Sequence, residues 1–307
     1  MSKDFEKIKR VTVPDIDKIL GKAFNILDDG FIRVIDYMGS DESIVQAARV
    51  SYGKGTKKVN EDRGLIRYLM RHQHTTPFEM CEIKFHVRVP MDCWRQWIRH
   101  RTANVNEYST RYSIAIDATQ KTKPTEWRQQ SSRNKQGSEL FLDEWDGANL
   151  SNKEKKIQNK LREVYDERIK LGVAREQARK DLPLSTYTEA YWKIDLHNLL
   201  HFLALRMDDH AQFEIRSYAN IIGNEIVKFW CPNVWEAFLD YRLGALKFSS
   251  IELEIIKNIE AGNTKKAISY AIEKGLLTKT GEIKKNRERD ELEIKMEMLN
   301  IRIPWKK

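Results

Sequence analysis

Cysteines and long apolar runs are both scarce in this chain. Among 307 residues there are three cysteines, Cys81, Cys93 and Cys231, and no two of them are close in sequence. This odd, dispersed set argues against a disulfide framework and against a zinc site built from cysteine. No run approaches the roughly 18 apolar residues that a membrane span needs, and residues 1–20 lack the apolar stretch of a signal peptide. We therefore expect a cytoplasmic protein without a membrane partner.

A strong imbalance of charge is also missing. The 54 basic and 45 acidic residues give a net charge of +9, with both signs interspersed along the chain. A basic surplus favours anionic partners, and nucleic acid is one such class. However, the aromatic residues Phe248, Tyr270 and Trp305 are too scattered for a base-stacking platform. We predict small anionic ligands and no nucleic acid. A DNA-binding protein is the alternative, which salt-dependent DNA binding by a colourless protein would favour.

Chemically active side chains are concentrated in residues 99–112, which read Arg-His-Arg-Thr-Ala-Asn-Val-Asn-Glu-Tyr-Ser-Thr-Arg-Tyr. Three arginines, a histidine and a carboxylate would be costly in a core. Each guanidinium presents a planar fork of donors that fits two oxygens of a phosphate or carboxylate. Because apolar Trp94, Trp97 and Ile98 come directly before it, the segment differs from a solvated charged turn. It predicts a site for phosphorylated ligands, with Arg99 and Arg101 on one side and His100 on the other if the chain is extended there.

Hydrophobic periodicity predicts the main elements. Residues 81–89 alternate apolar and polar side chains, which indicates a strand with one buried face, and shorter strands are expected over 31–37 and 184–194. Ser40, Asp195 and Asn233 are expected helix N-caps, and Ser151 with Glu154 is expected to open a helix as a capping box. A loop is expected over 72–77. Further helices are predicted to start at Asn60 and to span residues 91–99, 174–180, 213–230, 251–259 and 265–274.

Several spaced motifs together resemble the flavin-dependent thymidylate synthases. Arg-His-Arg is followed after seven residues by Ser109, which resembles the signature of that family. Further matches occur in the same order along the chain, at residues 48–51, 74–79, 95–97 and 203–214, so that the likeness spans about residues 28–242. Agreement of several motifs makes a chance match improbable.

The resemblance implies a reaction and a set of partners. A member of this family converts dUMP to dTMP, with 5,10-methylenetetrahydrofolate as the carbon donor, NADPH as the reductant and FAD as the hydride carrier. The implied assembly is a homotetramer whose active sites are shared between subunits. The classical thymidylate synthases instead use a cysteine nucleophile, and none of the three cysteines here lies in the Pro-Cys-His setting expected for it.

The resemblance also assigns site residues. Arg206 is the catalytic candidate, because its family counterpart contacts the pyrimidine and favours the ionised ring, which activates the weakly nucleophilic C5. An ion pair with Asp208, Asp209 or Glu214 is the alternative role for Arg206. The implied FAD contacts are Ser51, Thr76, Glu79, Arg99, His100, Arg101, Glu107, Asp195, His197 and His201. The implied dUMP contacts are Gln96, Arg99, Glu107, Tyr108, Ser109, Arg111, Arg179 and Arg206, and His74 is a candidate for the folate pocket.

Histidine spacing suggests a different class of enzyme. His197 and His201 are four residues apart on a predicted helix, with Asp209, His210 and Glu214 nearby, as in a metal-dependent hydrolase. Such a pair is only half of a metal site and lacks the His-Glu-x-x-His form. We therefore predict no metal.

The fold is predicted to be α+β, with a central antiparallel or mixed sheet flanked by helices and a helical C-terminal extension. The expected domains are an N-terminal extension over residues 1–27, a catalytic domain over 28–244 with a polar insertion at about 120–150, and a C-terminal extension over 245–307. The insertion and the extension have no predicted role.

Overall fold

The computed structural model describes residues 9–50, 59–131 and 137–306. The chain forms two compact units, Met1–Leu243 and Gly244–Lys307. Within the described residues, no helix combines the length and the apolar character that crossing a membrane requires.

A five-stranded antiparallel sheet forms the centre of the first unit. Its strands lie in the order β1, β2, β3, β7, β4, and every neighbouring pair is antiparallel. The bounds are β1 Phe24–Ile26, β2 Gly30–Met38, β3 Glu82–Pro90, β7 Tyr187–Asp195 and β4 Asn104–Glu107. The predicted α+β class is therefore confirmed, with an antiparallel sheet.

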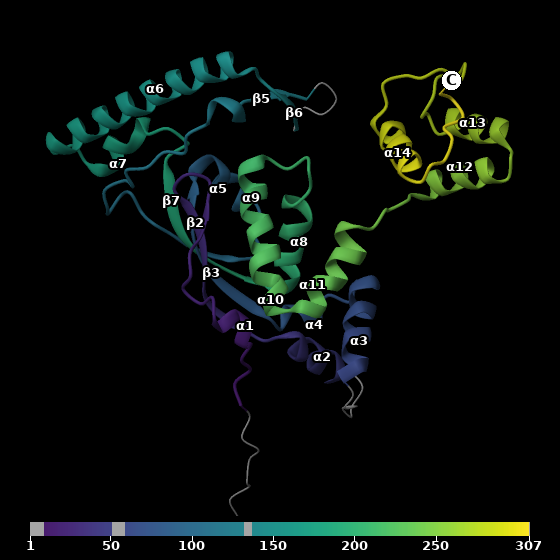
Figure 1. Ribbon diagram of the computed structural model, residues 1–307, viewed down its shortest axis with the longest axis horizontal. Helices are drawn as coiled ribbons and strands as arrows, with labels where there is room; N and C mark the ends of the chain where they lie inside the picture. The colour runs from purple at the N-terminus through teal and green to yellow at the C-terminus, as the bar shows by residue number, and fades with distance from the viewer. Residues whose placement is uncertain (1–8, 51–58, 132–136, 307) are drawn as a thin grey trace, which may run out of the picture. The chain divides into compact units, whose positions relative to one another are not determined.

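One face of the sheet is covered by helices. On β3, Ile83, Phe85 and Val87 are buried, as the alternation predicts, and they lie on the face against which α5 (Met91–Trp97), α8 (Leu196–Arg206) and α9 (Phe213–Ile221) pack. In Figure 1 the green helices α8 and α9 lie in front of these strands. The opposite face carries polar side chains, such as His86 on β3, and forms a separate surface.

Trp97 lies at the centre of the packed layer. It is fully buried, and its ring meets Trp192 of β7 edge-on with the ring centroids 5.1 Å apart. Its ring centroid is also 5.0 Å from that of Phe202 on α8 and 5.5 Å from that of Tyr218 on α9. Aromatic pairs of this kind stabilise a fold by about 0.5–1.5 kcal/mol each beyond the area that they bury. Trp97 therefore joins the end of α5 to the sheet and to two helices.

The remaining helices of the first unit include one with a π-helical segment. The segment predicted as one helix over 213–230 is helical throughout, but its middle, Ile222–Val227, is π-helical between α9 and α10 (Lys228–Trp230). The other helices are α1 Pro14–Asp17, α2 Asp41–Val50, α3 Val59–Arg71, α4 Thr76–Glu79, α6 Glu144–Lys170, α7 Arg175–Ala178 and α11 Pro232–Phe238.

Short helical turns complete the first unit. The 3-10 turns are Pro124–Glu126 and Arg179–Asp181, and a π-helical turn spans Leu239–Leu243. The second unit contains α12 Ser250–Glu260, α13 Thr264–Glu273 and α14 Arg287–Met298 around a small apolar core.

The predicted capping box at Ser151 is wrong. Helix α6 begins at Glu144, where the Asp143 side chain caps it by accepting from Asp146 N. Ser151 lies inside this helix; its hydroxyl donates to Thr122 O at 2.6 Å and accepts from Trp127 Nε1 at 3.0 Å. A capping sequence inside a helix can instead serve tertiary contacts, and here it holds the insertion against α6.

Two other predicted caps and the loop also need correction. The Ser40 hydroxyl is buried without a partner in the described residues, and Ser43 Oγ instead accepts from Ser40 N. Helix α11 begins at Pro232 rather than after Asn233, because proline is favoured in a first helical turn. The expected loop over 72–77 ends early, since α4 begins at Thr76. Asp195 caps α8 as predicted, accepting from Asn198 N at 2.9 Å.

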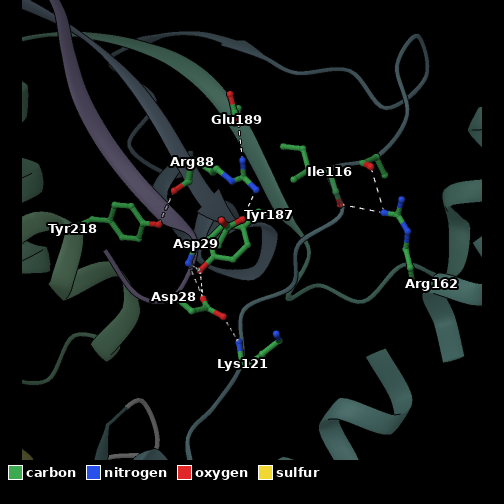
Figure 2. A network of polar contacts seen from close by, with 10 residues as sticks. Asp28, Asp29, Arg88, Ile116, Lys121, Arg162, Tyr187, Glu189 and Tyr218 are labelled. Atoms are coloured by element: carbon green, nitrogen blue, oxygen red, sulfur yellow. Dashed lines mark hydrogen bonds and ion pairs between the residues drawn. The ribbon is translucent and has the colours of Figure 1, made fainter. Parts of the chain in front are cut away.

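A polar network anchors the segment that leads into the insertion (Figure 2). Asp28, in the turn between β1 and β2, accepts from Tyr187 OH at 2.5 Å and from Lys121 N at 3.0 Å. Arg88 of β3 pairs with Asp29 and with Glu189 of β7. On the other side of the same segment, Arg162 of α6 donates to the main-chain oxygens of residues 115 and 116. The insertion therefore starts from a fixed position.

Gly39 provides a test of the packing between β2 and β3. Its φ is +86°, and an added Cβ would lie 2.6 Å from Cys81 Sγ and 3.1 Å from Met80 O. We expect Gly39→Ala to lower the free energy of unfolding by about 2–4 kcal/mol, from left-handed strain and overlap together. Gly21 also has a positive φ, of +73°, but open space around it. Gly21→Ala should cost only about 1–2 kcal/mol in the same urea titration; equal losses would contradict this packing.

Candidate active site

Five of the predicted site residues line one cleft, which we call the arginine pocket. It has a volume of about 400 Å³. It is lined by Arg99, His100, Arg101, Thr102, Ile194, Asn198, His201, Leu205 and Arg206. The fold thus brings the Arg-His-Arg motif after α5 together with one side of α8, although the two are far apart in sequence.

The extended conformation that would place His100 opposite the two neighbouring arginines is not found. Arg99 N donates to Gln96 O at 3.3 Å, and His100 N donates to Trp97 O at 3.0 Å. These bonds continue the turn at the end of α5, so the motif is not extended and all three side chains line the same pocket.

Arg206 is held in the arginine pocket by neutral partners. Its Nε donates to His100 Nε2 at 3.1 Å, and its Nη2 donates to Gln96 O at 3.4 Å. The alternative role, an ion pair with a nearby acid, is not observed. Those acids have other partners: Asp208 with His210, Asp209 with Arg216, and Glu214 with Arg128.

The position of His100 determines its protonation state. Burial, followed by the positive charge of Arg206 and the proximity of His201, lowers the pKa of His100 to about 4. The ring is therefore neutral near pH 7, and its Nε2 can accept from Arg206 while the proton sits on Nδ1. A neutral acceptor orients Arg206 without cancelling its charge.

The arginine pocket is suited to an anion. Among the residues that the structure describes, no carboxylate forms an ion pair with Arg99, Arg101 or Arg206. Burial lowers the pKa of Arg206, yet a guanidinium stays charged in proteins. Three such groups around one cleft repel each other until an anion binds between them. Phosphate or pyrophosphate oxygens would match both the charge and the donors.

The two histidines proposed as metal ligands lie in different cavities. His201 lines the arginine pocket, with its ring centroid 6.0 Å from that of His100. His197 lines a cavity of only about 10 Å³ together with His74 and Arg242. In the described parts of the chain, no group of three or more His, Cys, Asp or Glu residues could hold a metal ion.

Glu107 and Tyr108 lie on a second surface, which we call the sheet pocket. This cleft of about 300 Å³ beside β3, β4 and β7 is lined by His86, Asn106, Glu107, Tyr108, Glu189, Ala190 and Tyr191. Glu107 is opposite Ala190 in the register, so its side chain lies on the helix-covered face of the sheet, whereas those of His86 and Tyr191 lie on the polar face. Glu107 Oε1 accepts from Thr188 Oγ1 at 2.9 Å, and Tyr108 OH donates to Ile114 O at 2.8 Å. Neither residue lines the arginine pocket.

Ser109, Arg111 and Arg179 form a third group, the Arg111–Arg179 cluster. Arg179 Nη1 donates to Thr110 Oγ1 at 2.6 Å, and Arg111 N donates to Ser109 Oγ at 3.4 Å. The Arg111 side chain is 55% exposed, and the ion pair that it forms in the described residues is with Glu176, at 3.9 Å. Both guanidinium groups therefore keep donors for an anion.

The other predicted residues are dispersed. Thr76 and Glu79 are exposed on α4. Asp195 caps α8 and does not line the arginine pocket, whereas the side chain of Gln96 reaches Gln212. Ser51 lies outside the described residues.

Sequence reasoning missed Asn198. The Asp195 side chain accepts from both the main-chain and the side-chain nitrogen of Asn198, at 2.9 and 2.7 Å, and Asn198 lines the arginine pocket. The spacing offered a signal, since an N-cap aspartate interacts with the residue three positions later.

The fold and the arginine pocket define an α+β protein with a cationic site for a phosphorylated ligand. A family model described as thymidylate synthase complementing protein matches residues 33–233. The chain is 54% identical over 257 residues to a flavin-dependent thymidylate synthase of Wolbachia pipientis wMel, covering 84% of this chain and 90% of that protein. It is 53% identical over 268 residues to that of Rickettsia conorii, covering 83% and 90%.

A solved structure is also similar. It is a UMP/dUMP methylase, PolB, from Streptomyces cacaoi bound with 5-Br dUMP, with a TM-score of 0.64, 31% identity, and coverage of 72% of this chain and 99% of that one. The chain belongs to the flavin-dependent thymidylate synthase family.

The low pKa of His100 makes a testable prediction. In the unfolded chain this histidine should titrate near its ordinary value of about 6.5. Between that pH and the folded-state pKa of about 4, the unfolded state binds more protons, so the contribution of His100 to stability is lost as pH falls through this window. Nitrogen-15 NMR of the imidazole should show Nε2 without a proton from pH 5 to 8. A titration midpoint near 6.5 for the folded protein would contradict the Arg206–His100 contact.

Proposed function

We propose that this chain synthesises dTMP by reductive methylation of dUMP, with a flavin, FAD, bound in the arginine pocket. Family membership supports the reaction, and the single structural observation that carries the proposal is the group of three guanidinium groups around this cleft, which have no carboxylate partner among the described residues. The proposed carbon donor is 5,10-methylenetetrahydrofolate, the reductant is NADPH, and the proposed location is the cytoplasm.

The donors of the arginine pocket fit a dinucleotide cofactor. Arg99 and Arg101 carry the charge that a pyrophosphate needs, and His100, Asn198 and His201 provide polar groups beside it. When bound, FAD would supply hydride transfer. Of the other proposed FAD contacts, Thr76, Glu79, Glu107, Asp195 and His197 lie outside this pocket, as reported above, and Ser51 is not described.

Arg206 is proposed to activate the pyrimidine. C5 of uracil is a weak nucleophile, and a cation fixed beside the base favours negative charge on the ring. The contact with neutral His100 keeps that charge available. All three cysteines are buried, and burial raises the pKa of Cys93 and Cys231. Since a thiolate is the form that attacks, these residues do not favour the rival mechanism with a cysteine nucleophile.

The proposed nucleotide contacts are divided between surfaces of one chain. Ser109, Arg111 and Arg179 would hold the phosphate of dUMP with Gln96 and Arg99, and Glu107 and Tyr108 would support the pyrimidine. Arg99 and Arg206 line the arginine pocket, whereas the sheet pocket and the Arg111–Arg179 cluster have other linings. We propose that a homotetramer joins these surfaces from different subunits. His74, beside His197, is proposed to line the folate pocket.

A visible spectrum is the direct test of this function. The purified protein is expected to be yellow, and adding dUMP should perturb the flavin absorbance because the two rings would share one site. Turnover should require dUMP, methylenetetrahydrofolate and NADPH together. A colourless protein that binds DNA with a steep salt dependence would overturn the proposal.

Substitutions of Arg206 and Arg101 should separate the effect on turnover from the effect on flavin binding. Arg206→Ala should keep its flavin and lose about 10²–10³ in kcat, the usual effect of removing one donor that stabilises a developing charge. Arg101→Ala should lose the flavin, measured as the ratio of visible to 280 nm absorbance. Arg10→Ala, which removes an exposed arginine paired with Asp36, should change neither quantity. The reverse assignment of the two effects would refute this division of roles.

A further inference from the structure

The insertion contacts the core through a partly buried ion pair. Strand β5 (Arg128–Gln130) pairs with β6 (Ser138–Phe141) in a small hairpin. From this hairpin, Arg128 Nη2 donates to Glu214 Oε1 at 2.8 Å, and its guanidinium lies 5.2 Å from the centroid of the Phe213 ring. Glu214 is 8% exposed, and its second oxygen has no partner in the described residues. Arg128 therefore provides the positive charge that pairs with the Glu214 carboxylate.

Glu214 lies in the same helical turn as a residue that reaches the proposed nucleotide site. Gln212 is the residue before α9, and its Oε1 accepts a hydrogen bond from Gln96 Nε2. Burial raises the pKa of Asp92, the nearby Glu214 raises it further, and a hydrogen bond from the Gln212 side chain lowers it. The Gln212 amide therefore lies between Asp92 and Gln96, two residues from the carboxylate that Arg128 holds.

The hairpin starts from a fixed base. Thr122 O accepts from Ser151 Oγ, and the Glu154 side chain accepts from both Thr122 N and Thr122 Oγ1. Trp127, next to Arg128, donates to Ser151 from Nε1. Together with the network of Figure 2, these bonds tie the insertion to α6 and to the sheet, so Arg128 approaches Glu214 from an ordered segment.

Loss of Arg128 would leave two acids without this cation. Glu214 and Asp92 would then repel each other in a buried environment, and breaking one side of a buried pair is costly. Movement of the first turn of α9 would relieve this repulsion, and Gln212 would move with it. The contact from Gln96 O to Arg206 involves the main chain of α5 and does not depend on Gln212.

We propose that Arg128 is a positioning residue for dUMP binding, which acts through Glu214 and Gln212 to hold the Gln96 side chain. The proposal rests on the function above, in which Gln96 contacts the nucleotide. It gives the insertion a role in substrate affinity: the hairpin sets the orientation of Gln96 without touching the substrate itself.

Steady-state kinetics of the full-length holoenzyme test this role. Arg128→Gln should raise the KM for dUMP about tenfold, or about 1.4 kcal/mol, and leave kcat within about twofold. The dissociation constant of dUMP, read from the change in flavin absorbance, should rise equally, and flavin content should stay unchanged. Glu214→Gln removes one of the two acids, so it should leave the KM near wild type, and adding it to Arg128→Gln should restore the KM, because no repulsion with Asp92 remains.

Arg67→Gln is the matched control. Arg67 pairs with Glu236 and Asp240, away from the insertion, and its side chain is 21% exposed, against 22% for Arg128. Its loss should lower the thermal midpoint without changing the KM for dUMP. Arg128→Lys keeps the charge and should give a KM between wild type and Arg128→Gln. If Arg128→Gln does not fold, Arg128→Lys, with its expected intermediate KM, still decides the question.

Three results would overturn the proposal: an unchanged KM in Arg128→Gln, a KM that stays raised in the double variant, or equal KM shifts in Arg128→Gln and Arg67→Gln. A wild-type protein that shows no flavin response to dUMP would instead refute the proposed function, so the two failures are distinguishable.

Discussion

The rest of the first unit depends on the contacts of the buried Trp97 ring. This ring ends α5 and packs at once against β7, α8 and α9, through Trp192, Phe202 and Tyr218. Arg99 and His100 follow Trp97 within three residues, in the turn that ends α5. The polar Arg-His-Arg motif therefore begins beside the buried aromatic layer. A rigid aromatic layer of this kind can hold cations close together, although by themselves they would move apart.

The arginine pocket departs from what stability alone would favour. Three guanidinium groups share one cleft, and a histidine stays neutral to accept from one of them. Such an arrangement costs free energy in the absence of a ligand and returns it when an anion binds, which is a usual property of functional sites. Family membership explains why such a cost is tolerated, because both a flavin dinucleotide and a nucleotide monophosphate are anions.

Contacts between segments that are distant in sequence hold the insertion in place against the core. Ser151 and Glu154, which have the pattern of a helix start, instead bind the insertion, while Arg128 reaches the buried Glu214. A polar segment without a strong periodic pattern therefore becomes ordered through its partners rather than through its own propensity. The same reasoning applies to the surfaces proposed to meet between subunits, where, under that proposal, a single chain would carry only part of each site.

The sequence by itself determined the α+β class, the strand over residues 81–89 and the Asp195 cap, because periodicity and capping are local properties, and it singled out the Arg-His-Arg motif that lines the arginine pocket. Tertiary structure alone decided that Arg206 meets His100, that His197 and His201 belong to different cavities, and that Ser151 lies inside a helix. These outcomes depend on which distant groups approach each other, and a hydrogen bond to a remote residue can outweigh a local preference of about 1 kcal/mol.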